Sequence, residues 1–319
     1  MAILKDSVRG HSSIFKFWNE FLNRDQSTAT LGFIGPDGVG KRKAAWALMQ
    51  QALCIHTPDV CGTCGHCLRV AGGAHESILW IQPEKDLIKV EKAREVLDFL
   101  SFKSLTKKRF VVLEQAELLN QQAANSLLKT LEEPPENTFF ILISANETGL
   151  MPTIRSRSMM FKFKPLSDSD LRGEKIIPDW IVRASRGSFS RLENLSRAET
   201  QSFRKEAAEL LLTVLKDPNF LIKSDWRDAI KDRDFFRALW PFWLELMRDV
   251  LWLQTGRKDL LICPDQGDVL KNLAQLNNVQ VEKIISAITQ FEKELSVPKD
   301  PQLVFEHFYV QNFHQNGIP

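Results

Sequence analysis

The stretch "GPDGVGKR", residues 35–42, carries residue types that bind nucleotide phosphates. In the P-loop pattern G-x-x-x-x-G-K-[ST], backbone N–H groups surround the phosphates, the lysine reaches the β- and γ-oxygens, and the Ser or Thr hydroxyl ligates Mg²⁺. The residues that keep this pattern are Gly35, Gly38, Gly40 and Lys41. Arg42 stands at the hydroxyl position, and a guanidinium has no acceptor atom for a cation. The stretch therefore predicts a P-loop that has lost its metal ligand.

A second element of nucleotide hydrolysis is expected at the end of a buried strand, where an Asp supports the metal and a Glu activates the attacking water. This chain has Glu114 and Gln115 there. The carboxylate of Glu114 could still approach a metal, but the neutral amide of Gln115 has no useful basicity. Arg42 and Gln115 are thus two independent changes, and both oppose hydrolysis.

Four cysteines in one short segment have the residue type and spacing of a metal site. They are Cys54, Cys61, Cys64 and Cys67. Four thiolates match a tetrahedral structural zinc site that makes the loop rigid, and His56 or His66 could replace Cys54 as a ligand. The alternative is a redox pair of Cys61 with Cys64, which leaves the other two cysteines unexplained. The fifth cysteine, Cys263, is expected to be a buried small apolar residue.

Two arginines lie in "TIRSRS", residues 153–158, just after the fourth expected strand. Isolated arginines in a loop are commonly solvated. The alternative is an arginine finger, a guanidinium presented to a phosphate that a neighbouring subunit binds, where it stabilises transition-state charge. The spacing alone does not choose between the two.

Five apolar runs predict the strands that position these residues. They are residues 30–34, 77–81, 109–113, 138–144 and 159–164. Helical patterns lie between them: helix formers follow Lys41, an apolar face begins at Val90, and Asn120 caps a helix that ends at Pro134. Strands that alternate with helices predict an α/β fold with a parallel sheet.

After residue 165 the strong patterns are helical, so a helical C-terminal part is expected. One apolar stripe at helical spacing consists of Val281, Ile284, Ile285, Ile288, Phe291 and Leu295. The aromatics of residues 235–253 are expected in a core or a subunit interface, because they lack interleaved cations. A chain of 319 residues with 44% hydrophobic residues suits more than one globular domain.

The net charge of +2 gives no general reason to bind nucleic acid. Residues 1–10 contain no apolar run of signal-peptide length, and no stretch approaches the ~20 apolar residues of a membrane span. We therefore expect a cytoplasmic protein without membrane contact, whose cysteines are thiols or metal ligands rather than disulfides.

Four sequence features together resemble one known family. "GPDGVGK", the cysteine cluster, "NSLLKTLEEPPENTFFILIS" and "TIRSRS" occur in the order seen in AAA+ clamp-loader subunits of bacterial DNA polymerase III. The resemblance covers about the first half of the chain, and "PQLVFEHF", residues 301–308, is similar to the last collar helix. It implies a RecA-like AAA+ P-loop domain at residues 1–165 with the zinc module at 54–67, a small helical lid at 166–196 and an all-α collar for oligomerisation at 197–319.

The departures from the family pattern fall on the nucleotide chemistry. Motor subunits keep the P-loop Thr, the Asp-Glu pair and a sensor arginine in a "GSxRDA"-like stretch, whereas "GSFSRL", residues 187–192, has Ser190 at that position and Arg191 one place late. The finger motif Ser-Arg-Cys is kept as Ser156-Arg157-Ser158. The resemblance thus implies a non-hydrolysing subunit that scaffolds the ring and offers Arg157 in trans. The implied partners are gamma/tau-like and delta-like subunits, the sliding clamp, and primer-template DNA through the assembled complex.

Two alternatives remain. An active motor subunit of the same loader would use Lys41 and Glu114, so the binding of ATP or ADP stays open. A nucleic-acid-reading cysteine module would need clustered cations, and Arg69 is the one cation near Cys67. A better basic patch for phosphates is the set Lys103, Lys107, Lys108 and Arg109, although such runs are commonly solvated.

Overall fold

The computed structural model describes residues 3–23, 28–56, 58–84, 86–102, 106–217, 219–223, 225–294 and 300–314. The chain divides into two compact units. The first unit consists of Met1–Lys175 and Arg186–Arg191, and the second of Ile176–Ser185 and Leu192–Pro319.

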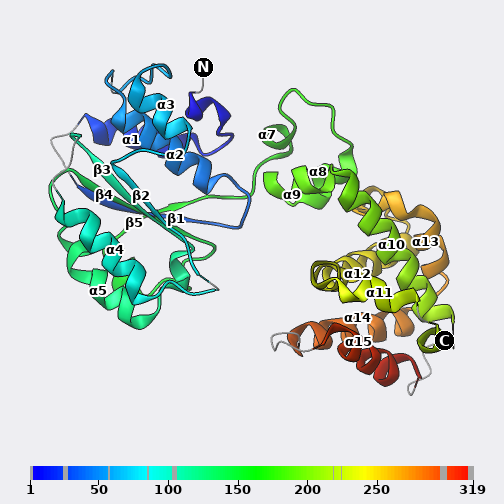
Figure 1. Cartoon of the computed structure of the whole chain (residues 1–319). Coiled ribbons are helices and arrows are strands. Elements are labelled where there is room, and N and C mark those ends of the chain that lie inside the picture. Colours follow the sequence, from blue (N-terminus) through cyan, green and yellow to red (C-terminus); the bar gives the residue numbers. More distant parts are fainter. Residues whose placement is uncertain are drawn as a thin grey trace. The chain divides into compact units, whose positions relative to one another are not determined.

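The first unit is built on a five-stranded parallel sheet with the strand order β2-β3-β4-β1-β5 (Figure 1). The strands are β1 Ala29–Ile34, β2 Ile78–Ile81, β3 Arg109–Glu114, β4 Thr138–Ser144 and β5 Met159–Lys162. Their ends lie within two residues of the predicted ones. The predicted parallel α/β architecture is therefore confirmed.

Alternate side chains of the central strands pack into two separate hydrophobic cores, one on each face of the sheet. On β3, Phe110 and Val112 belong to one apolar cluster, and Val111 and Leu113 belong to the other. Helices α1 (Ser12–Leu22) and α2 (Lys41–Leu53) cover the first face, while α4 (Val90–Ser101) and α5 (Gln121–Glu132) cover the second (Figure 1). Burial on both faces explains why these strands read as continuous apolar runs.

Short-range signals fix the ends of the helices. The side chain of Asn120 accepts a hydrogen bond from the backbone N–H of Ala123, so it caps α5 as predicted. The helix ends at Glu132, before Pro134. The remaining elements of this part of the chain are η1 Leu4–Ser7, α3 Gly65–Ala71, η2 Ala116–Leu118 and α6 Pro152–Arg155.

From residue 168 onward, every element in the described part of the chain is helical. These elements are α7 Asp168–Arg172, α8 Asp179–Ser185, α9 Phe189–Leu195, α10 Ala198–Lys216, η3 Phe220–Ile222, α11 Asp225–Lys231, α12 Arg233–Gln254, η4 Lys258–Leu260, η5 Pro264–Gln266, α13 Gly267–Leu273, α14 Asn278–Glu294, α15 Pro301–Tyr309 and η6 Val310–His314.

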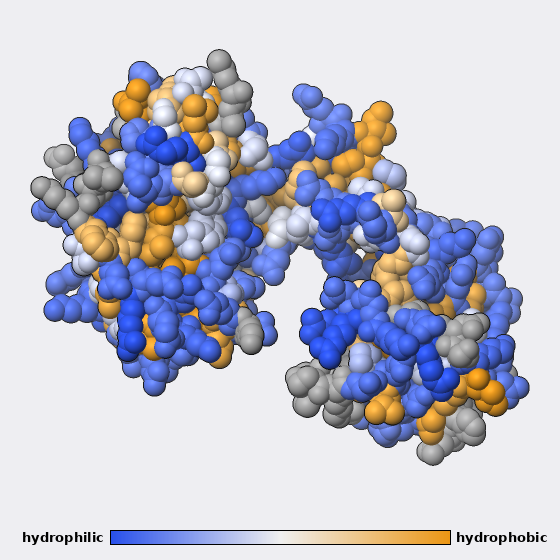
Figure 2. All heavy atoms as spheres, in the orientation of Figure 1, coloured by the Kyte–Doolittle hydropathy of each residue, from blue (hydrophilic) through white to orange (hydrophobic). Residues whose placement is uncertain are grey.

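Aromatic side chains form the core of the second unit. The ring of Trp240 lies 4.6 Å from that of Phe291 and 4.9 Å from that of Phe308, measured between centroids. Within the predicted stripe of α14, Val281, Ile284, Ile288 and Phe291 are buried and Ile285 is half-buried, while Leu295 lies outside the described residues. On the face drawn in Figure 2, hydrophilic residues cover most of each unit's surface. Among the described residues, no helix has the length and apolar character needed to cross a membrane.

A buried ion pair joins α10 to η5 in the second unit. The guanidinium of Arg204, which is 2% exposed, donates to both carboxylate oxygens of Asp265 at 2.9 and 2.7 Å. It also lies 4.7 Å from the ring centroid of Phe242 and 5.1 Å from that of Trp180. Asp265, although opposed by burial of the pair, raises the pKa of Arg204, so the guanidinium stays charged.

Replacing Arg204 with leucine is expected to lower the free energy of unfolding by about 3 kcal/mol, because it leaves the Asp265 carboxylate without its charged partner. Denaturant unfolding of the purified chain measures the loss. The matched control is Arg257→Leu, which breaks an exposed pair with Asp259 and should change stability by less than about 1 kcal/mol. Equal losses in the two variants would contradict the prediction.

Candidate functional site

The P-loop joins β1 to α2, with Gly35 after the strand and Gly40 before the helix. Gly38, at its centre, has φ +77°, a left-handed backbone that favours glycine. A Cβ atom at Gly38 would lie 2.1 Å from the hydroxyl oxygens of both Ser188 and Ser190. Glycine is therefore required here by the backbone and by the close approach of a second segment.

Lys41 is held by its own loop. Its side chain is 6% exposed, and its Nζ donates to the carbonyl oxygens of Gly35 and Pro36, the latter at 3.0 Å. The Asp37 carboxylate lies 3.6 Å from the same nitrogen. Burial lowers the pKa of Lys41, and Asp37 opposes that shift. The lysine amine is thus satisfied by loop carbonyls.

Arg42 of the P-loop and Glu114 of the second nucleotide element contact each other. Arg42 Nε lies 3.2 Å from Glu114 Oε1, and Glu114 Oε2 accepts hydrogen bonds from Trp80 Nε1 and Gln82 Nε2, both at 2.9 Å. The Arg42 guanidinium also lies 5.6 Å from the ring centroid of Trp80, which stacks on Trp46 at 4.8 Å. Both carboxylate oxygens of Glu114 are therefore engaged by protein groups.

These contacts show that the two nucleotide elements meet through Arg42 and Glu114. Arg42 follows β1 and Glu114 ends β3, and the parallel sheet brings the carboxyl ends of both strands to one edge. Gln115 is exposed, and its backbone turns with φ +50° into η2. The Trp80 and Gln82 contacts could not be predicted, because no local pattern marks them.

A segment far along the chain, residues 186–191, packs against the P-loop within the first unit. The backbone N–H of Phe189 donates to the Gly38 carbonyl at 2.8 Å. The Phe189 ring lies 4.8 Å from Lys43 Nζ and 5.6 Å from the Arg9 guanidinium. Ser190, which stands where the family resemblance implies a sensor arginine, therefore lies directly against the P-loop and carries no charge.

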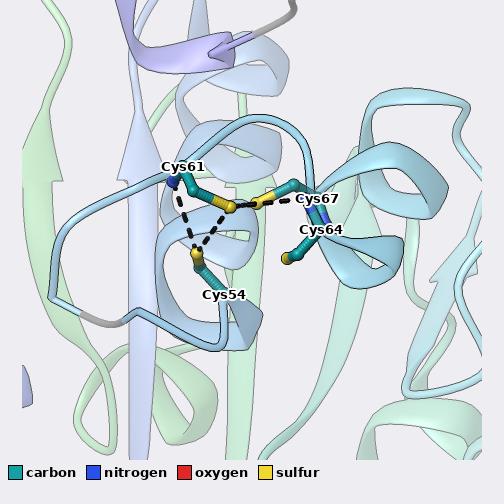
Figure 3. Close-up of side chains that lie close together, drawn as sticks. All are labelled: Cys54, Cys61, Cys64 and Cys67. Carbon is teal, nitrogen blue, oxygen red and sulfur yellow. Dashed lines mark hydrogen bonds between the residues drawn. The ribbon is translucent and has the colours of Figure 1, made fainter.

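The four predicted cysteine ligands come together at the end of α2 and the start of α3 (Figure 3). Their sulfur atoms lie within 4.8 Å of one another, with Cys54 to Cys61 at 3.6 Å and Cys61 to Cys67 at 4.0 Å. Tetrahedral zinc with Zn–S bonds of about 2.3 Å needs sulfur atoms about 3.8 Å apart. Cys54, Cys61, Cys64 and Cys67 thus fit a single zinc ion.

The environments of the cysteine module, residues 54–67, differ from one thiol to the next: burial raises the pKa of Cys67, whereas backbone N–H groups favour the thiolate form of Cys61. The N–H groups of Thr63 and Cys64 lower the pKa of Cys61 to about 5. The N–H of Cys67 points at Cys64 Sγ at 3.5 Å. All five cysteines are free thiols, and Cys263 is buried, as predicted. The four-cysteine set is complete without His56 or His66.

His66 belongs to a second cluster beside the module. His66 Nδ1 lies 2.9 Å from His75 Nε2 and 3.1 Å from Arg69 Nη2, and Arg69 also bonds both carboxylate oxygens of Glu76 at 3.1 and 3.2 Å. The guanidinium already supplies positive charge at this cluster, which opposes a metal cation. Because Arg69 is paired with Glu76, it is also a poor phosphate contact for a nucleic-acid-reading module.

The predicted basic patch is wrong in part. Arg109 is buried and donates to the carbonyls of Leu100 and Phe102 and to Thr138 Oγ1. It therefore satisfies backbone groups inside the first unit and does not face a ligand. Lys103 lies outside the described residues.

Arg157 follows α6 and is partly exposed, at 30%. Its Nε and Nη2 donate to Glu132 Oε2 at 3.1 and 2.9 Å, and its Nη1 donates to the Thr153 carbonyl at 2.9 Å. None of these partners belongs to the P-loop. The "LEEPP" stretch, which contains Glu132, contributed to the family resemblance. The ion pair between Glu132 and Arg157 was not predicted.

Comparison with known proteins places these features in one family. A family model described as DNA polymerase III, delta subunit, matches residues 10–167, which include the P-loop, the cysteine module and Arg157. The chain is 27% identical over 307 residues to the DNA polymerase III subunit delta' of Bacillus subtilis (strain 168), over 92% of this chain and 93% of that protein.

A second delta' sequence and one solved structure are also similar to this chain. The delta' subunit of Pseudomonas aeruginosa is 34% identical over 172 residues, which are 52% of this chain and 51% of that protein. The solved structure of a DNA polymerase III gamma subunit-related protein from Thermotoga maritima aligns with 94% of this chain and 99% of its own, with a TM-score of 0.56 and 17% identity, and so has the same fold. The chain is therefore similar over nearly its whole length to the DNA polymerase III subunit delta', and residues 10–167 match the delta-subunit family model.

Proposed function

We propose that this chain is the clamp-loader subunit that does not hydrolyse ATP itself and that presents Arg157 to ATP bound by a neighbouring motor subunit. In this role the Arg157 guanidinium stabilises the charge that develops on the transferred phosphoryl group. The chain also scaffolds the ring in which the sliding clamp is loaded during DNA replication. Its partners are gamma/tau-like and delta-like subunits, the clamp, and primer-template DNA through the assembled complex.

The observation that supports a silent nucleotide site most strongly is the contact between Arg42 and Glu114. A working P-loop holds Mg²⁺ between a hydroxyl and a carboxylate, whereas here the guanidinium binds the carboxylate directly, with 3.2 Å between Nε and Oε1. A fixed positive charge at this place repels a divalent cation and removes its ligand. Gln115 supplies no base, so the metal and the activated water are both missing.

The isolated chain is therefore expected to hydrolyse no ATP above background in the presence of Mg²⁺. Phosphate release measured over hours, with Lys41→Ala as the comparison, checks this. Equal background rates in both proteins support the proposal. ATP turnover that disappears in Lys41→Ala would instead identify an active motor subunit, the alternative that the retained lysine favours.

The domain boundaries that we propose for the chain are those implied by its resemblance to clamp-loader subunits. Residues 1–165 form the RecA-like AAA+ domain, residues 166–196 the helical lid and residues 197–319 the collar through which the ring assembles. We further propose that Cys54, Cys61, Cys64 and Cys67 hold a structural Zn²⁺. Their sulfur distances and the donor set support zinc, which would join the end of α2 to α3 and make the loop between them rigid.

A further inference from the structure

We propose that Glu132 is a positioning residue, which holds the Arg157 guanidinium so that its outer edge faces a phosphate on the neighbouring subunit. This inference rests on the proposed function and extends it to a residue that makes no contact with nucleotide in that scheme. Glu132 is the last residue of α5, and Arg157 follows α6, so the pair joins two elements.

The hydrogen bonds of Arg157 engage the edge of its guanidinium formed by Nε and Nη2 and one side of Nη1. Nε and Nη2 both donate to Glu132 Oε2, and Nη1 donates to the Thr153 carbonyl. A guanidinium has five N–H donors in a planar fork. Nη1 also donates to the Ser156 hydroxyl through a long bond of 3.4 Å, so one N–H, on Nη2, remains without a partner among the described residues. The outer edge consists of this Nη2 N–H and the Nη1 N–H that makes the long Ser156 bond, and it matches bidentate phosphate binding once a phosphate replaces the Ser156 hydroxyl.

Both acceptors that hold Arg157 lie on anchored parts of the first unit. Helix α5 is fixed by the buried side chains of Leu127 and Leu131 on its inner face. Thr153 precedes Ile154, which is fully buried in the same core. The flexible arginine side chain is thus ordered before any phosphate arrives. Such preorganisation lowers the entropic cost of reaching the transition state.

Because the Glu132–Arg157 ion pair is exposed, a positioning role can be tested separately from a role in folding stability. The Glu132 side chain is 56% exposed and that of Arg157 is 30% exposed. Ion pairs this exposed contribute little to folding stability. Removing the Glu132 carboxylate should therefore leave the fold intact and change the rate at which the neighbouring subunit turns over ATP.

The test uses the loader reconstituted from all its subunits, with DNA-stimulated ATP turnover as the readout. Glu132→Ala is expected to lower kcat about tenfold at the ATP site that Arg157 faces, with KM for ATP changed by less than about twofold, because orientation and not binding is lost. Glu132→Gln keeps a side-chain acceptor for the guanidinium and should recover part of the loss. Glu133→Ala is the matched control, since Glu133 is exposed and has no side-chain bond within the described residues.

The double variant Glu132→Ala/Arg157→Ala distinguishes the two proposals. If Glu132 acts through Arg157, the double variant has the kcat of Arg157→Ala alone. Full activity in Arg157→Ala would overturn the proposed function and this inference with it. A large loss in Arg157→Ala combined with unchanged turnover in Glu132→Ala would overturn only the inference. Faster turnover in Glu132→Ala would also overturn it, because the carboxylate would then restrain the finger. Thermal unfolding of each variant confirms that the chain is folded.

Discussion

Arg157→Ala is expected to reduce ATP turnover at the facing site of the assembled loader on the order of 10³-fold. The physical reason is that a guanidinium placed against the transferred phosphoryl group neutralises charge that exists only in the transition state, so its loss lowers kcat. Arg157 suits this task because it is partly exposed and its bonds go to groups outside its own P-loop. The effect is best measured with DNA present and with the other ATP sites of the ring inactivated.

The control for this experiment is Arg155→Ala. Arg155 is exposed, lies two residues before Arg157, and has no side-chain bond within the part of the chain that the structure describes. Its removal deletes the same charge from the same surface but should leave the turnover nearly unchanged. An equal loss in both variants would indicate a general electrostatic effect, and an unchanged rate in Arg157→Ala would remove the finger role. Arg157→Lys should not restore the rate fully, because lysine lacks the planar fork.

Removing the metal, or replacing Cys64 with serine, is expected to disorder the cysteine module. Apparent binding free energies of structural zinc are on the order of 10 kcal/mol, and this energy is coupled to local folding because the loop has no other means of keeping four thiolates together. The intact chain, purified under reducing conditions, should therefore contain one Zn²⁺ per molecule. Elemental analysis and the melting temperature before and after chelation measure the effect.

Cys263→Ser is the matched control for metal content. Cys263 is buried in the second unit, so this variant should keep its zinc even if the substitution lowers stability. A protein free of zinc in metal-replete medium, or one with a disulfide between Cys61 and Cys64, would contradict the zinc assignment and favour the redox alternative.

Most of the first unit could be predicted because its signals are local. The runs that became β1, β3 and β4 have continuous apolar centres, since they are buried on both faces of a parallel sheet. The cap of α5 and its end before Pro134 follow from backbone chemistry within one turn. The cysteine cluster was also predictable, because its ligands lie within a short segment whose loop closure is inexpensive.

Long-range partners could not be predicted in the same way. The basic run that includes Arg109 looked like a surface patch, but Arg109 is buried, and the carbonyls that it satisfies belong to Leu100 and Phe102 at the end of α4. Likewise, nothing near Phe189 in the sequence indicates that its backbone binds the Gly38 carbonyl.

The sequence by itself determined that the P-loop pattern lacks its metal-ligating hydroxyl and that the second element lacks its base, because Arg42 and Gln115 have the wrong functional groups in any fold. Only the tertiary structure decided that Arg42 binds Glu114 and that Arg157 binds Glu132. The reason is geometric: parallel strands bring segments distant in the chain to one edge of the sheet, and side-chain pairing there depends on strand order, which no single segment encodes.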